Sequence, residues 1–157
     1  MENEIIEKEG FTLPRYQDIP DVGLYLDQVV KYINGFFEED EDLKITPSML
    51  TNYVKLKLVQ KVRKKTYSRD QIALFFFIAM AKTVLSIDNI RLCLSVWNKD
   101  EEDFSKNYAY FRTHMLKALS GIDDAEDGNS MILNITSAIA RKLKLDRFFR
   151  TLSAESE

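Results

Sequence analysis

The strongest constraint on the fold of this chain is an unbroken apolar run of ten residues, IALFFFIAMA, at positions 72–81. Ser68 and Gln71 precede the run at the spacing of a capping box, a pattern typical of a helix start. Ten residues are too few to span a bilayer, which takes about 20 in a helix. A helix that is apolar on all sides has to be enclosed by other elements. The run therefore predicts a central buried helix from Ser68 to about Leu85.

The remaining elements are expected to be mostly helical too. Five Gly and three Pro among 157 residues favour long helices over a turn-rich β fold, and the length fits one domain or a small domain with an appendage. Apolar spacing and capping residues predict five further helices, at 21–37, 46–55, 86–97, 104–119 and 130–152. In the last of these, we expect one packed side made of Ile132, Ile135, Ile139, Leu143 and Phe149.

Four segments outside these helices are expected to be irregular. Residues 1–12 are predicted to be a flexible N-terminus, and FTLPRYQDIP at 11–20, with its two prolines, an extended arm that wraps the domain. The acidic block EEDED at 38–42 is predicted to be a solvated loop. The segment LVQKVRKKTY at 58–67 alternates weakly, which indicates a small hairpin or wing.

Charge is distributed very unevenly along the chain. The window from Lys44 to Arg69 holds eight basic residues and no Asp or Glu, while the whole chain carries −3, which leaves −11 for everything outside the window. The eight are Lys44, Lys55, Lys57, Lys61, Arg63, Lys64, Lys65 and Arg69. Such separation indicates a surface for a polyanion, most simply double-stranded DNA. The alternatives are a solvated basic face, or one that pairs with the chain's own acidic block or with an acidic partner.

The sequence contains few residues in patterns typical of catalysis or metal binding. The single Cys93 excludes an internal disulfide and points to a reducing compartment, and the acidic start MENEIIEKEG does not look like a signal peptide, so we expect a cytoplasmic protein. His114, the only histidine, has no Cys, Asp or Glu at metal-ligand spacing in its own helix. No phosphate-cradling glycine loop is present. We therefore predict no catalytic residues, no metal, no cofactor and no enzymatic activity.

The stretch from Thr46 to Leu94 resembles the DNA-binding domain of the MerR family of transcription regulators. The matching positions, in order, are Pro47-Ser48, Leu50, Tyr53, Leu58-Val59, the basic run from Lys61 to Lys65, Tyr67-Ser68, Asp70-Gln71-Ile72 and the helical stretch from Ser86 to Ile90. The longer stretch from Leu13 to Leu94 looks closer still to a bacterial family known as the domain of unknown function 1836, found largely in Gram-positive bacteria. The segments that carry this second resemblance are LPRYQDIPD, LYLDQVVKYI, ITPSMLTNYVKLKLV and KKTYSRDQIA.

The MerR resemblance implies a mainly α fold. Residues 13–97 would form a winged helix-turn-helix domain with a small β-wing, and residues 98–157 a helical pair that completes the core, dimerises, or both. The helix at 46–55 would be the recognition helix, with Ser48, Thr51 and Asn52 nearest the base edges. The wing at 58–67 and its neighbours would meet phosphates through Lys55, Lys57, Lys61, Arg63, Lys64 and Lys65.

The expected function is therefore that of a bacterial transcription regulator, working as a homodimer on two half-sites of duplex DNA. No motif indicates a particular small-molecule effector, and the sequence does not exclude that an effector binds. Three departures from the MerR pattern stand beside the matches: Thr51 and Asn52 occupy places where the family has Arg and Tyr, Thr66 occupies the place of a wing Arg, and the acidic block lies between the first two helices. The alternative function is a non-enzymatic helical module for protein interaction or assembly.

Overall fold

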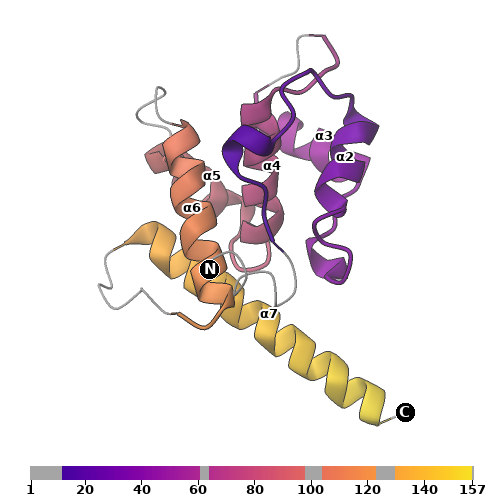
Figure 1. Ribbon diagram of the computed structural model, residues 1–157, viewed down its shortest axis with the longest axis vertical. Helices are drawn as coiled ribbons and strands as arrows, with labels where there is room; N and C mark the ends of the chain where they lie inside the picture. The colour runs from indigo at the N-terminus through magenta and orange to yellow at the C-terminus, as the bar shows by residue number, and fades with distance from the viewer. Residues whose placement is uncertain (1–11, 61–63, 98–103, 123–129, 157) are drawn as a thin grey trace.

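The computed structural model describes residues 12–60, 64–97, 104–122 and 130–156, and this part of the chain is mainly helical (Figure 1). Six α-helices follow one another as α2 (Leu26–Asn34), α3 (Pro47–Lys55), α4 (Arg69–Ala81), α5 (Ile87–Trp97), α6 (Phe104–Leu119) and α7 (Met131–Glu155). Two short 3-10 helices, η1 (Tyr16–Asp18) and η2 (Glu41–Leu43), lie in the connections.

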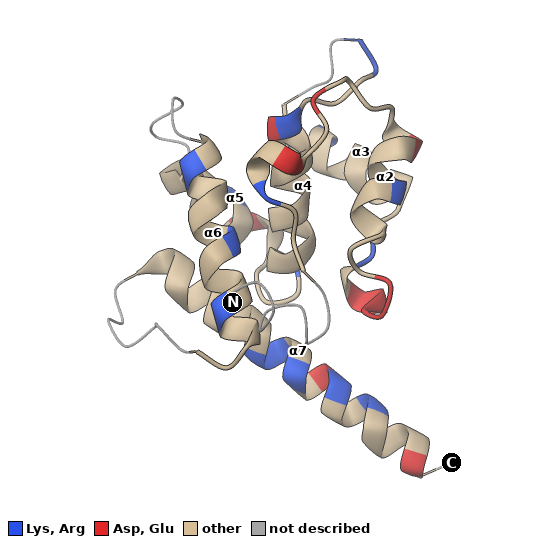
Figure 2. Cartoon of the chain, viewed as in Figure 1, with Lys and Arg blue, Asp and Glu red and all other residues tan. Residues whose placement is uncertain are grey.

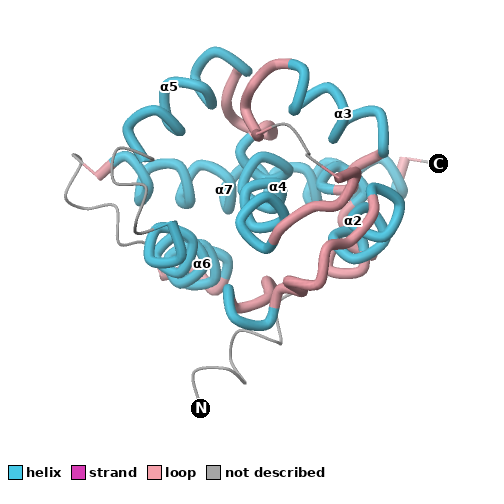
Figure 3. The backbone as a smooth tube through the Cα atoms, turned by 90° about the horizontal axis from the view of Figure 1, so that it is seen from above, coloured by secondary structure: helices cyan, strands magenta, loops and turns pink. Residues whose placement is uncertain are grey.

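Helix α4 is the central element, as its apolar run predicts. Viewed from above it lies in the middle, with α2, α3, α5 and α6 around it (Figure 3), and every residue of 72–81 is buried. The capping box is formed: the Ser68 hydroxyl accepts from the Gln71 N–H at 3.3 Å, and the Gln71 side chain accepts from the Ser68 N–H at 2.8 Å. The predicted end at Leu85 was wrong, since α4 stops at Ala81. Beyond it, the N–H of Thr83 bonds the carbonyl three residues back, which tightens the last turn.

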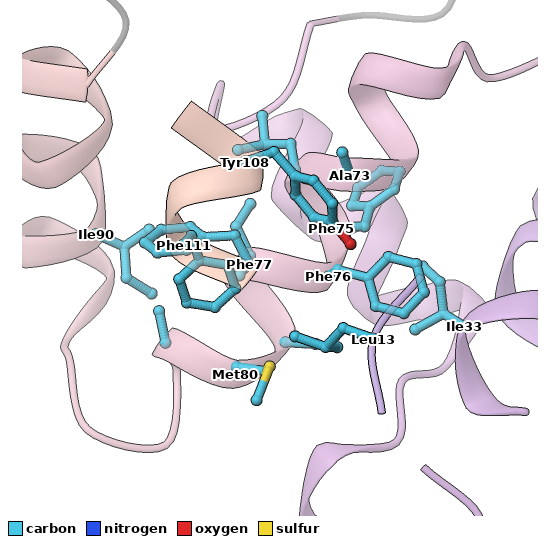
Figure 4. Close-up of a cluster of buried hydrophobic side chains, with 14 of the residues drawn as sticks. Leu13, Ile33, Ala73, Phe75, Phe76, Phe77, Met80, Ile90, Tyr108 and Phe111 are labelled. Carbon is cyan, nitrogen blue, oxygen red and sulfur yellow. The ribbon is translucent and has the colours of Figure 1, made fainter. Parts of the chain in front are cut away.

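The three phenylalanines of α4 point to different neighbours and join the layers together (Figure 4). Phe75 meets the Tyr67 ring at 5.5 Å between centroids, and Phe77 meets Trp97 at 4.6 Å and Phe111 at 5.0 Å. Phe76 lies among rings of the α2 region at 5.4–6.0 Å: Tyr32, Phe36 and Phe37. Edge-on and tilted pairs of this kind stabilise a core beyond the area they bury.

Helix α2 is shorter than the sequence predicts. It begins at Leu26 rather than after Asp21, with Tyr25 at the N-cap, whose N–H donates to the Gln28 side chain at 2.9 Å. Asp21 instead accepts from the backbone N–H of Arg69 at 3.2 Å, so its carboxylate stabilises the start of α4. Gly23, with φ of 77°, turns the chain between the two positions. The sequence predicted Asp21 as the N-cap of α2. Asp21 instead stabilises the start of α4 through a tertiary contact.

The proline-containing arm lies against α6. Leu13 and Pro14 are buried, and their carbonyls accept hydrogen bonds from the guanidinium of Arg112 at 2.8 Å and from the hydroxyl of Tyr108 at 2.7 Å. Burial raises the pKa of Tyr108, which keeps this hydroxyl a donor. The first residues that the structure describes are therefore held against α6, a helix far along the sequence.

The acidic block is not simply a solvated loop, and that prediction was wrong for one of its members. Glu38, Glu39, Glu41 and Asp42 are exposed, but Asp40 is only 2% exposed. Arg147 and Arg150 of α7 approach its carboxylate at 3.4 and 3.9 Å. A buried carboxylate needs such partners, and here they come from the far end of the chain.

Helix α7 packs on α6 and α4 along its first half only. Its buried residues end at Leu143, and its second half extends past the other helices (Figure 1). The prediction that Phe149 shares the packed side was wrong, because Phe149 is 56% exposed. Six residues of helix turn it about 240° away from Leu143.

Candidate nucleic-acid interface

Helix α3 is built by local sequence and presents one polar face. The Thr46 hydroxyl accepts from the Met49 N–H at 3.2 Å, and Pro47 occupies the first helical position, where a missing N–H costs nothing. Leu50 and Tyr53 are buried and hold the helix against the core. The opposite side carries four exposed residues at helical spacing: Ser48, Thr51, Asn52 and Lys55.

A side-chain clamp sets the position of α3 relative to α2. The amide of Asn34, the last residue of α2, donates to the Ile45 carbonyl at 2.9 Å and accepts from the Ile45 N–H at 2.8 Å. This pair closes the connection that contains the acidic block, just before the Thr46 cap. The two helices are therefore joined by a fixed geometry.

The C-terminal end of α3 places a lysine where glycine is usual. The N–H groups of Lys57 and Leu58 bond the carbonyls of Val54 and Tyr53, both at 3.0 Å, which is the Schellman pattern. Lys57 occupies the left-handed position of this motif with φ of 61°. A residue with a Cβ pays about 1–2 kcal/mol there.

A second lysine adopts the same backbone conformation nearby. Lys65 has φ of 59°, and it and Lys64 are exposed. Among the described residues, Lys57 and Lys65 are the non-glycine positions with positive φ. Both belong to the basic window, so the chain keeps cations at two places where glycine would relieve strain.

The predicted β-wing at 58–67 is not found in the described part of this segment. Residues 58–60 and 64–67 contain no strand, and Lys61 and Arg63 lie outside the described residues. The Tyr67 N–H bonds the Leu24 carbonyl at 2.8 Å in an isolated bridge, and the Gln60 carbonyl accepts from the Gln71 side chain at 3.0 Å. Because these groups bond outside the segment, they are not available for a hairpin ladder there.

One cation beside α3 was missed in the sequence. Arg91 of α5 donates to the carbonyl of Leu56, the C-cap of α3, at 2.6 Å, and its side chain is exposed. A guanidinium at this end satisfies an unpaired carbonyl and interacts favourably with the helix dipole. Spacing along the chain does not reveal it, because the contact is between separate helices.

The acidic block lies away from the basic residues that precede α4. Figure 2 shows the acidic segment at one end of α2, while the basic residues that precede α4 lie near the other end. Its buried member, Asp40, faces the arginines of α7. The basic residues just before α4 therefore lie toward the opposite end of α2 from this negative charge.

Other reactive groups do not form a site in the described residues. Burial raises the pKa of the Cys93 thiol to about 11, which makes it a poor nucleophile at neutral pH. His114 packs against the Tyr110 ring in a tilted arrangement, at 4.2 Å between ring centroids. No group of three or more metal-ligating side chains gathers within the described ranges. Nor does any helix there combine the length and apolar character needed to traverse a lipid bilayer.

Residues 14–113 match the family model of a domain of unknown function, DUF1836. The match covers more than half of the chain, and the chain therefore belongs to this family. The resemblance to the domain of unknown function 1836 is confirmed. It extends from the arm into α6, across the predicted boundary at residue 97. No curated protein and no solved structure matches the chain.

Proposed function

We propose that this chain binds duplex DNA through α3 and the lysines that follow it, as a bacterial transcription regulator without covalent chemistry. In this proposal Ser48, Thr51 and Asn52 approach base edges in the major groove. An Asn side chain can pair with adenine through two hydrogen bonds, and a Thr methyl can contact thymine. The hydroxyl of Thr51 already donates to the Pro47 carbonyl at 3.0 Å, which favours the methyl contact.

The observation that carries the proposal is the left-handed backbone of Lys57 and Lys65. Both follow α3 in the sequence, and both are exposed. Strained backbone that persists on a surface indicates that the side chain has a use. A cation that contacts phosphate is such a use. Lys55 in the last turn of α3 and Arg91 at its C-cap add charge beside that helix, and Lys64 adds charge next to Lys65 in the sequence.

The MerR-like form of the proposal treats α2 and α3 as a helix-turn-helix pair. The Asn34–Ile45 clamp supports it, since a recognition helix needs a fixed position relative to its scaffold. The segment at 58–67 then serves as a basic loop in place of a β-wing. Lys61 and Arg63 remain candidate phosphate contacts on the sequence alone.

Fluorescence anisotropy with a random-sequence duplex tests the proposal at about 50 and 200 mM salt. We expect binding at low salt that weakens steeply at the higher concentration. Replacing Lys61, Arg63, Lys64 and Lys65 by Ala should abolish binding while circular dichroism shows unchanged helix content. The matched control replaces Lys106 of α6 and Lys144 of α7 by Ala and should bind nearly as the wild type does. No binding by the wild type at low salt contradicts the proposal.

A second candidate is an assembly module that does not bind DNA. The observation in its favour is the set of exposed apolar side chains on the second half of α7: Leu145, Phe148, Phe149 and Leu152. The same anisotropy series separates the two functions, because the assembly module predicts a flat signal at both salt concentrations.

A further inference from the structure

Two large side chains at the start of α2 are exposed although the loop that carries them is held in place. Val22 is 83% exposed and Tyr25 is 56% exposed, whereas Leu24 between them is partly buried against the core. A single exposed apolar residue on a surface is ordinary. Two within four residues, on a fixed loop, become informative when their neighbours are known.

This loop is joined to the loop that precedes α4. The Tyr67 N–H donates to the Leu24 carbonyl at 2.8 Å. One residue away, Gly23 approaches Thr66 so closely that a Cβ at position 23 would lie 3.3 Å from the Thr66 side chain. The two loops therefore keep a fixed position relative to each other, and glycine permits their close approach.

The contact between the loops brings cations beside the two exposed side chains. Lys64 and Lys65 immediately precede Thr66, and both are exposed. Figure 2 shows the basic residues before α4 near one end of α2 and the acidic block at the other. Because the acidic block follows the last residue of α2, the basic residues lie near the end at which α2 begins. We call the surface formed by Val22, Tyr25, Lys64 and Lys65 the two-loop tip.

The two-loop tip lies next to the segment that follows α3. The first turn of α4 binds both of them. The Arg69 N–H donates to the Asp21 carboxylate, beside Val22, at 3.2 Å, and the Gln71 side chain donates to the Gln60 carbonyl at 3.0 Å. The tip is therefore adjacent to the chain that leaves the helix for which we propose major-groove contacts.

We propose that the two-loop tip is a second contact with duplex DNA, on the sugar–phosphate backbone beside the groove that α3 enters. Val22 packs against deoxyribose carbons, and the Tyr25 hydroxyl donates to a phosphate oxygen. Lys64 and Lys65 neutralise phosphates of the same strand. A DNA backbone suits this surface because apolar sugar and anionic phosphate alternate along it. Such contacts position a protein on the duplex without reading its sequence.

The inference rests on the proposed function, and it assigns Val22 and Tyr25 a role that their spacing in the sequence did not indicate. Fluorescence anisotropy with a random-sequence duplex, across about 50 to 200 mM salt, tests it. Val22→Ser should weaken binding roughly three- to tenfold at every salt concentration, because an apolar contact is lost. The slope of log K against log salt should stay that of the wild type, since no charge changes. Lys65→Gln should instead make the slope about 0.9 shallower.

The chain offers a matched control for each apolar or aromatic substitution. Val96→Ser changes an exposed valine in the last turn of α5, and it should bind as the wild type does. Tyr25→Phe should weaken binding roughly three- to tenfold with an unchanged slope, because a hydrogen bond to phosphate is lost. Tyr110→Phe, at an exposed tyrosine of α6, should have no such effect. Circular dichroism and melting temperature establish that each variant keeps the wild-type fold.

Two results would overturn the two-loop tip and leave the proposed function in place. One is wild-type affinity for DNA in both Val22→Ser and Tyr25→Phe. The other is a shallower salt slope for Val22→Ser, because the loss would then come from displaced cations. If these variants bind DNA normally but lose binding to polyglutamate, the tip belongs to an acidic protein surface and not to DNA. Absence of DNA binding by the wild type at low salt overturns both proposals together.

Discussion

At the scale of single residues, the most informative positions are those where local preference and the observed residue disagree. Lys57 closes α3 in a conformation that favours glycine, and Lys65 repeats this after a short interval. The four outward residues of α3 were predictable, since the Thr46–Pro47 start and the spacing of Leu50 and Tyr53 set the orientation of the helix. The contact of Arg91 with α3 was not predictable, because its hydrogen bond to the Leu56 carbonyl depends on how α5 lies against α3.

Lys57→Gly should leave the protein as stable as the wild type or stabilise it by roughly 0.5 kcal/mol. Removing the Cβ relieves the left-handed penalty, and the greater freedom of glycine in the unfolded chain offsets part of that gain. Urea denaturation measures the change, and DNA affinity should fall at the same time. Lys57→Gln, which keeps the Cβ, should lose affinity without the gain in stability. A Lys57→Gly protein more than about 1 kcal/mol less stable than wild type would contradict this account of the turn.

Because of Tyr16, we expect the folded protein to lose stability at alkaline pH. Burial, together with the hydrogen bond that its hydroxyl donates to Asp70 at 2.5 Å, raises its pKa from 10.0 to about 12. The folded state therefore favours the protonated phenol. Its contribution is fully present below pH 10 and is lost as pH rises towards 12.

The melting temperature of wild type and Tyr16→Phe, measured from pH 8 to about 12, checks this. The difference between the two proteins should shrink above pH 10, because only the wild type loses the phenol contact there. Other tyrosines titrate in both proteins and cancel in the comparison. A difference that stays constant with pH would show that Tyr16 does not stabilise the arm through its proton.

At the scale of elements, the start of a helix was predicted well where local residues determine it. Where contacts with distant segments determine the start, the prediction was wrong. The capping box and apolar run of α4 and the Ser86 cap of α5 are local, and both helices begin where expected. The late start of α2 follows from Asp21 bonding to α4, which no window along the chain contains. In α7, Phe149 was misread because it was assigned to the same packed side as Leu143, whereas it is exposed.

Tyr108→Phe tests how the arm is held to α6. The buried hydroxyl donates to the Pro14 carbonyl, so its removal leaves that acceptor unpaired and should cost about 1–2 kcal/mol of unfolding free energy. Hydrogen exchange of the neighbouring arm amides should become faster at the same time. Tyr110→Phe is the control, since Tyr110 is exposed, and it should change stability by less than about 0.5 kcal/mol. Equal effects of the two substitutions would argue against the arm contact.

Arg147→Ala tests the link between α7 and the acidic loop. The substitution removes the nearer of two guanidinium groups from a carboxylate that is nearly inaccessible to water. Because the arginine itself is partly exposed, we expect a cost of about 1–2 kcal/mol, below that of a fully buried pair. Arg150→Ala, at 3.9 Å, should cost less, and Lys144→Ala, on the same helix, close to nothing. Chemical denaturation would contradict the link if all three variants matched the wild type.

At the scale of the whole molecule, the uneven charge of the chain becomes an arrangement in space. The basic residues before α4 lie near one end of α2 and the acidic block at the other (Figure 2). Composition and periodicity predicted a mainly helical fold around a buried α4. The division at residue 97 stays a prediction, although α4 packs on both α6 and α7. The packing of segments far apart in sequence, such as the arm on α6, could not be read from local patterns.

The salt dependence of DNA binding tests the central claim most directly, namely that the lysines around α3 form a phosphate-binding surface. Each phosphate contact contributes about −0.9 to the slope of log K against log salt. The variant replaces Lys55, Lys57, Lys64 and Lys65 by Gln, and the control replaces Lys106 and Lys144 by Gln. The account predicts a slope about 3 to 4 units shallower for the first variant and an unchanged slope for the second. Equal slopes for all three proteins, or no binding by the wild type at low salt, would contradict it.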